Sequence, residues 1–130
     1  MLTTRIYEKV AISERQAMLK FTGLRDDELV NVRLERDPFP EINLQHWDGI
    51  IMCGSHFDVS APEDSKSLRQ LDVERNLTRL SEKAIAEDFP ILGICYGLGS
   101  MARMLGGSVS PAISEDITAP QLTVTPQGRV

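Results

Sequence analysis

Cysteine and basic charge are both scarce in this sequence, and each scarcity excludes a class of site. The two cysteines, Cys53 and Cys95, are too few and too far apart for a disulfide framework or a paired-cysteine metal site, so each is considered as a free thiol. The 14 basic residues are scattered and are outnumbered by 19 acidic ones, which gives a net charge of -5. A nucleic-acid groove needs clustered Lys and Arg to neutralise phosphates. We therefore expect no metal ion, no cofactor and no nucleic-acid partner.

Long apolar runs are also missing. No stretch approaches the roughly 18 to 20 apolar residues of a membrane-spanning helix, and residues 1–5 lack the apolar centre of a signal peptide. Hydrophobic residues make up 42% and charged residues 25% of the chain, values near those of globular proteins. The 130 residues fit one ordinary domain. These features predict a single cytoplasmic domain over residues 1–130 that does not contact a membrane.

Short apolar segments alternate along the chain with segments of helical periodicity. Five segments are expected to be strands: residues 1–6, 29–34 at an edge, 49–54 and 90–95 buried on both faces, and 121–125. Three are expected to be helices: residues 13–23, opened by a capping-box pattern, then 73–84 and 98–105. Strands that alternate with helices predict an α/β fold, namely a three-layer flavodoxin-like sandwich around a mostly parallel sheet.

The turn that follows the 90–95 strand carries a Gly-x-Cys-x-Gly pattern around Cys95. A nucleophile on a sharp strand-to-helix turn has a strained backbone, and its neighbours Gly93 and Gly97 must be small for the strand and the helix to approach each other. The helix N-terminus beside Cys95 favours the thiolate. The free N–H groups there, beginning with that of Tyr96, are suited to bind an oxyanion. Cys95 is thus a candidate nucleophile, the alternative being a core cysteine that ends a buried strand.

Two further candidate site residues, Gly54 and Ser55, lie at the end of the 49–54 strand. In parallel sheets, ligands bind beyond the carboxyl ends of the strands, so Gly54 and Ser55 should reach the same edge as Cys95. Glycine at this position lets the backbone approach a substrate and offer an N–H group, although an ordinary turn is the alternative. Cys53 lies inside the apolar run and has no flanking pattern of small residues. We interpret it as a packing residue.

Three ordered blocks of the sequence resemble the class I, GMP-synthase-like glutamine amidotransferase family. They are residues 48–55, 89–97 and 102–109, and a weaker likeness extends over residues 122–128. The resemblance implies that the Cys95 thiolate attacks the side-chain amide of glutamine, releases ammonia and leaves a glutamyl thioester that water cleaves. It also implies an oxyanion hole built from the Tyr96 N–H and an N–H of the Gly54–Ser55 turn. A synthetase domain or subunit would receive the ammonia.

Two departures from the family pattern concern the substrate and the base. Gly99 stands where the family usually has a glutamine that helps to hold the substrate, and the family's catalytic His-x-Glu motif does not occur in the chain. His46 precedes the 49–54 strand and so falls at the wrong end of the sheet, whereas His56 follows it and is a candidate for a minor role. The missing motif also predicts a partial domain whose sheet is incomplete at its C-terminal end.

Three functions therefore stay open for the chain. The first is a glutamine amidotransferase or glutaminase domain, with glutamine as substrate. The second is another cysteine enzyme of the PfpI-like superfamily, which Gly99 favours. The third is a non-catalytic binding or regulatory module that has the elbow without the base. An incomplete sheet exposes apolar edges and faces, so we also expect self-association.

Overall fold

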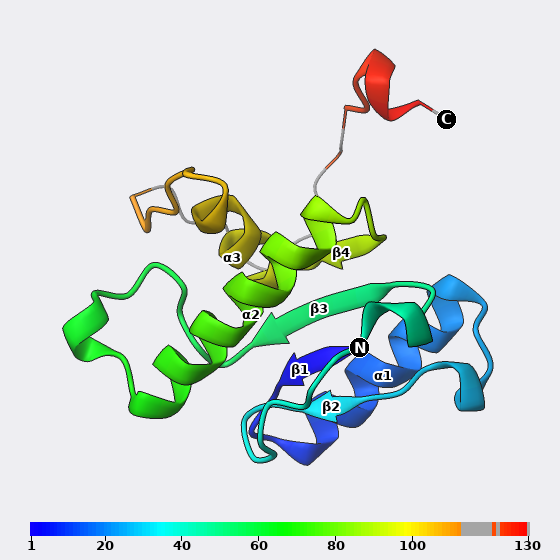
Figure 1. Ribbon diagram of the computed structural model, residues 1–130, viewed down its shortest axis with the longest axis horizontal. Helices are drawn as coiled ribbons and strands as arrows, with labels where there is room; N and C mark the ends of the chain where they lie inside the picture. The colour runs from blue at the N-terminus through cyan, green and yellow to red at the C-terminus, as the bar shows by residue number, and fades with distance from the viewer. Residues whose placement is uncertain (113–120, 122, 130) are drawn as a thin grey trace.

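Four parallel strands form the centre of the structure (Figure 1). The computed structural model describes residues 1–112, 121 and 123–129. In chain order its strands and longer helices are β1 (Leu2–Thr4), α1 (Glu8–Thr22), β2 (Val32–Arg33), β3 (Ile50–Ser55), α2 (Leu68–Ala86), β4 (Ile91–Gly93) and α3 (Tyr96–Met104). The strand order is β2-β1-β3-β4, and each neighbouring pair is parallel. All the strands therefore direct their carboxyl ends to one edge of the sheet.

Helices cover both faces of the sheet. α2 and α3 lie on one face and α1 lies on the other (Figure 1). The apolar core is on the α2 side, where Met52 of β3 and Leu2 of β1 join the buried stripe of α2. The members of that stripe are Val73, Leu77, Leu80 and Ala84, and all four are buried as predicted. The predicted α/β fold, a three-layer flavodoxin-like sandwich with a parallel sheet, is confirmed.

The face of the sheet that α1 covers is more polar. Side chains alternate between the two faces of a strand, so Thr3 lies on the opposite face from Leu2. The Thr3 hydroxyl donates to Glu14 of α1 at 2.8 Å. Arg33 of β2 is buried on this side, where it pairs with Glu35 at 2.5 Å and with Glu8 of α1 at 2.9 Å. α1 is therefore tied to the sheet largely by polar contacts.

α1 begins five residues earlier than the sequence pattern predicted. The helix starts at Glu8 after the extended residue Tyr7, so the capping-box pattern at residues 13–16 lies inside the helix and the prediction was wrong. Ala11, which is only 2% exposed, packs in the first turns and favours the earlier start. The predicted end is confirmed, because Gly23 caps the helix in the left-handed conformation, with φ 74°.

The strand predictions hold in the middle of the sheet and fail toward its margins. β3 begins and ends one residue later than the predicted segment 49–54 and so includes Ser55, and β2 forms at an edge as predicted but over two residues. β4 was expected to be buried on both faces, yet Leu92 is 52% exposed because β4 is the other edge strand of the described sheet. Residues 121 and 123–125 are not in a strand, and Leu122 lies outside the described residues.

Within the described part of the chain, no helix is both long and apolar enough to cross a membrane.

Candidate active site

β4 turns sharply into α3 at Cys95. The backbone angles of this residue are φ 54° and ψ -107°, a combination that side-chain-bearing residues rarely adopt. Such strain costs on the order of 1–3 kcal/mol and persists only where the surroundings enforce it. The Cys95 side chain is exposed at the carboxyl edge of the sheet. The strained elbow expected from the sequence is confirmed.

Two glycines allow the elbow to form against β3. A Cβ atom on Gly93 would lie 2.8 Å from the carbonyl group of Gly97, and one on Gly97 would lie 2.3 Å from the carbonyl oxygen of Met52. Both distances are too short for real carbon atoms, so neither position accepts a side chain without movement of the backbone. The Ile94 N–H also donates to the Met52 carbonyl at 2.8 Å. The predicted need for small residues on both sides of Cys95 is confirmed.

The first turn of α3 presents backbone N–H groups beside Cys95. The N–H of Gly97 donates to Ile94 and that of Gly99 to Cys95, whereas the Tyr96 N–H has no hydrogen-bond partner among the described residues. The Tyr96 ring is buried, and its hydroxyl donates to Glu74 of α2 at 3.2 Å. Burial and the neighbouring Glu74 carboxylate raise the pKa of this hydroxyl, which therefore keeps its proton. The ring anchors the residue whose amide is the candidate oxyanion donor.

Gly54 and Ser55 form the carboxyl end of β3 rather than a turn, and they lie next to the elbow. Met52 is paired with Gly93, and neighbouring strands are about 4.8 Å apart, so the residues that follow each of them meet at one edge. The Gly54 N–H donates to a Glu14 carboxylate oxygen at 3.2 Å. This amide is therefore already engaged, and the next amide along the chain is that of Ser55.

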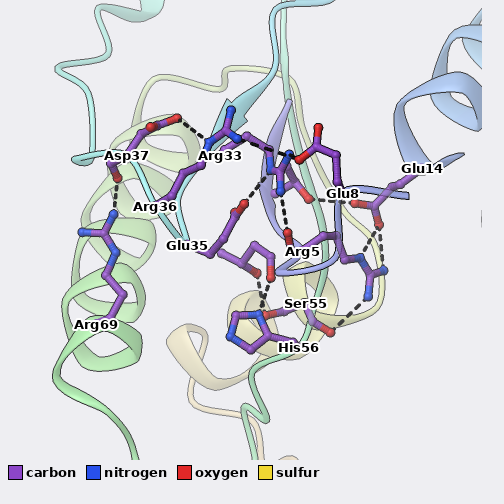
Figure 2. A network of polar contacts seen from close by, with 12 residues as sticks. Arg5, Glu8, Glu14, Arg33, Glu35, Arg36, Asp37, Ser55, His56 and Arg69 are labelled. Carbon is purple, nitrogen blue, oxygen red and sulfur yellow. Dashed lines mark hydrogen bonds and ion pairs between the residues drawn. The ribbon is translucent and has the colours of Figure 1, made fainter. Parts of the chain in front are cut away.

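Two charged residues that the sequence analysis did not single out contact Gly54 and Ser55. Figure 2 shows Arg5 between Glu14 and Ser55: its guanidinium donates to the Glu14 carboxylate at 2.8 and 3.2 Å and to the Ser55 carbonyl at 3.1 Å. Arg5 follows β1 directly, so its position after a strand was a usable signal. Glu14 lies inside α1, and no local motif marks it.

His56 lies at the predicted edge of the sheet and is exposed. Its Nδ1 is 2.5 Å from the carbonyl oxygen of Thr4. A carbonyl oxygen only accepts, so Nδ1 carries the proton and Nε2 keeps its lone pair. The contact with Thr4 holds the ring on the β1 side of β3, whereas Cys95 follows β4 on the other side. His56 thus has the tautomer of a base but is turned away from the elbow strand.

Cys53 and Gly99 behave differently from the elbow residues. Cys53 is 3% exposed, and burial raises the pKa of its thiol to about 12, so it is an unreactive packing residue as predicted. At Gly99, a Cβ atom would lie 2.8 Å from a methyl carbon of Val59. A longer side chain there would require the segment around Val59 to move.

Among the described residues, no group of three or more His, Cys, Asp and Glu is arranged to hold a metal ion.

Comparison with known proteins is consistent with this geometry. The Peptidase C26 family matches residues 29–128. A glutamine-hydrolysing GMP synthase of Prochlorococcus marinus (strain MIT 9215) is 51% identical over 72 residues, which are 55% of this chain and 11% of that protein. The corresponding enzyme of Bordetella parapertussis (strain 12822) is 39% identical over 66 residues, which are 51% of this chain and 10% of that protein. No solved structure matches the chain significantly.

The region shared with the GMP synthases is short relative to those enzymes, since it spans about a tenth of their length. The family match is broader, because it covers most of the chain and includes β3, β4, the elbow and α3. The chain therefore belongs to the Peptidase C26 family, whose domain is of the class I glutamine amidotransferase type.

Proposed function

We propose that the chain is a glutaminase domain in which Cys95 attacks the side-chain amide of glutamine. The observation that carries the proposal is the strained, exposed cysteine at the start of α3, held between Gly93 and Gly97. Membership of the Peptidase C26 family and the likeness to glutamine-hydrolysing GMP synthases support the choice of glutamine.

The proposed reaction has two steps through a covalent intermediate. The sulfur of Cys95 bonds to the amide carbon of glutamine, the C–N bond breaks, and the nitrogen leaves as ammonia with the proton of the thiol. Water then adds to the glutamyl thioester, the C–S bond breaks, and glutamate leaves while Cys95 regains a proton. Dividing one difficult displacement in this way is the usual benefit of nucleophilic catalysis.

Two amides are proposed as the oxyanion hole. The Tyr96 N–H lacks a hydrogen-bond partner among the described residues, and the Ser55 N–H lies at the carboxyl end of β3, beside the elbow. Donors that are fixed before the reaction stabilise a developing oxyanion without a cost of reorganisation. Because the Gly54 N–H is bound to Glu14, Gly54 contributes through its close backbone rather than through its amide.

The ammonia is proposed to pass to a synthetase partner, as the likeness to the GMP synthases suggests. A minor role is proposed for His56, the histidine at this edge of the sheet, although its contact with Thr4 turns the ring away from the elbow strand. A second copy of the chain is a further proposed partner. Leu92, on the edge strand β4, is 52% exposed. Sedimentation velocity tests this point, because a monomer at all concentrations would contradict it.

The test of the proposed function compares two cysteine substitutions. Ammonia release from glutamine is measured for the unaltered chain, for Cys95→Ala and for the matched control Cys53→Ala. We expect Cys95→Ala to abolish release and Cys53→Ala to retain it, because Cys53 is buried and protonated. Equal release by the unaltered chain and by Cys95→Ala would rule out the proposal.

A second candidate function is that of another cysteine enzyme of the PfpI-like superfamily. Gly99 favours it, since the site lacks the usual glutamine side chain there and a Cβ atom at this position would lie 2.8 Å from Val59. This alternative predicts that Cys95 reacts with simple electrophiles and not with glutamine-shaped ones. The third candidate, a non-catalytic module, is favoured by the missing His-x-Glu motif and predicts no turnover of any amide.

A further inference from the structure

Arg5 and Glu14 hold the two peptide groups that flank the Gly54–Ser55 peptide at the carboxyl edge of the sheet. Glu14 accepts the N–H of Gly54 at 3.2 Å, and Arg5 donates to the carbonyl of Ser55 at 3.1 Å. The peptide group that joins Gly54 to Ser55, and that carries the Ser55 N–H, lies between these two held groups. Glycine otherwise gives a backbone wide freedom of rotation. The two contacts therefore restrict the direction of the Ser55 N–H.

The contact between Arg5 and Gly54 is closer than a side chain at position 54 would permit. A Cβ atom there would lie 2.0 Å from Nη2 and 2.8 Å from Cζ of Arg5. The guanidinium group thus occupies the space that the missing side chain leaves. A side chain at position 54 would therefore displace the Arg5 guanidinium from its present place.

The pair is itself braced by neighbours on three elements. Thr3 of β1 donates to the second oxygen of Glu14 at 2.8 Å. Arg33 of β2 donates to the Arg5 carbonyl at 2.6 Å, and its other arm binds Glu8 of α1 (Figure 2). Side chains locked by such neighbours are what a precise site requires, because oxyanion donors lose their effect when they are displaced by a fraction of an ångström.

We propose that Arg5 and Glu14 are positioning residues that aim the Ser55 N–H at the oxyanion formed on the carbonyl that Cys95 attacks. This inference rests on the proposed function. Glu14 adds no net negative charge to the site, because Arg5 neutralises it. The pKa of Arg5 is raised chiefly by its hydrogen bond with Glu14, so the guanidinium stays charged beside this carboxylate.

The test uses two reactions of the same sulfur. Alkylation of Cys95 by iodoacetamide attacks a saturated carbon and forms no oxyanion, whereas acylation by p-nitrophenyl acetate forms one. Loss of a single oxyanion donor costs roughly 100- to 1000-fold in other cysteine and serine sites. For a donor that is displaced rather than deleted, we expect Glu14→Gln to slow acylation about tenfold and to leave alkylation within about twofold.

Two further variants separate positioning from a general loss of structure. Arg5→Lys keeps the charge but cannot bind Glu14 and Ser55 together, so we expect the same selective loss of acylation. Asp26→Asn is the matched control, since Asp26 is also a carboxylate paired with an arginine, Arg15 of α1, but touches neither Gly54 nor Ser55. We expect it to change neither rate. Alkylation of Cys53 reports unfolding, because this thiol is buried in the folded chain.

The outcomes distinguish this inference from the function on which it rests. Equal slowing of acylation and alkylation in Glu14→Gln and Arg5→Lys, or no slowing in either variant, overturns the inference alone. Acylation that persists unchanged in Cys95→Ala overturns the proposed function and the inference with it. Selective loss of acylation in both variants, with Asp26→Asn unaffected and Cys53 protected, supports the inference.

Discussion

Replacing Gly97 with alanine puts a methyl group at the point where α3 touches β3. The new carbon would lie 2.3 Å from the Met52 carbonyl oxygen and 2.7 Å from the Met52 Cβ atom. An ordinary contact begins at 3.4 Å, so the helix and the strand must separate by about 1 Å. Overpacking of this kind costs roughly 1–3 kcal/mol, and alanine returns up to about 1 kcal/mol through its better helix propensity. Since the clash involves backbone, we expect a net loss of about 2 kcal/mol.

Urea denaturation followed by circular dichroism measures this loss. With a slope of about 1–3 kcal/mol per molar of urea, the midpoint should fall by about 1 M. The control is Gly49→Ala, whose new carbon would have no neighbour closer than 3.4 Å, and we expect its stability to change by less than about 0.5 kcal/mol. Because the elbow moves with α3, alkylation of Cys95 should also change in Gly97→Ala. A variant as stable as the unaltered chain, with unchanged Cys95 reactivity, would refute the close packing of the elbow on β3.

Two further predictions concern buried titratable groups. The pKa of Cys53 is about 12 in the folded chain against an ordinary value of 9.0, so its contribution to stability is complete below pH 9 and is lost as pH rises toward 12. Between pH 9 and 11 the unaltered chain should lose up to about 1.4 kcal/mol per pH unit more than Cys53→Ala, and parallel curves would count against this. Arg33→Ala leaves the buried Glu35 carboxylate unpaired and should cost about 3–5 kcal/mol in urea titrations, whereas Arg33→Met combined with Glu35→Leu should cost much less. A double variant as unstable as the single one would contradict that account.

The centre of the fold and the elbow were predictable because local pattern and tertiary structure agree there. The apolar run at residues 49–54 forms β3, and the glycines around Cys95 meet a steric demand that is visible in the sequence. The start of α1 was not predictable from the capping-box pattern, because the helix includes the buried residue Ala11, which precedes that pattern. The exposure of Leu92 depends on which strand ends the sheet, and strand order is not a local property.

The candidate site was predictable only where it follows a motif. Cys95 and Tyr96 were located by the elbow pattern, and Gly54 and Ser55 by the end of an apolar strand. The roles of Arg5 and Glu14 escaped, because they depend on contacts between residues 40 and 50 positions apart in the sequence. The engagement of the Gly54 amide by Glu14 likewise required the fold, since α1 has to cross the sheet before the two groups meet.

Site-specific labelling by a glutamine-shaped chloroketone tests the central claim most directly. The reagent carries the α-amino and carboxyl groups of glutamine, so its reaction reports both a reactive thiol and recognition of the amino acid. We predict one adduct, found on Cys95 by peptide mass spectrometry, slowed by free glutamine and absent from Cys53. Iodoacetamide serves as the reference reagent for the same thiol. Rapid alkylation of Cys95 by iodoacetamide, together with no chloroketone adduct or no protection by glutamine, would contradict the assignment of glutamine as the substrate.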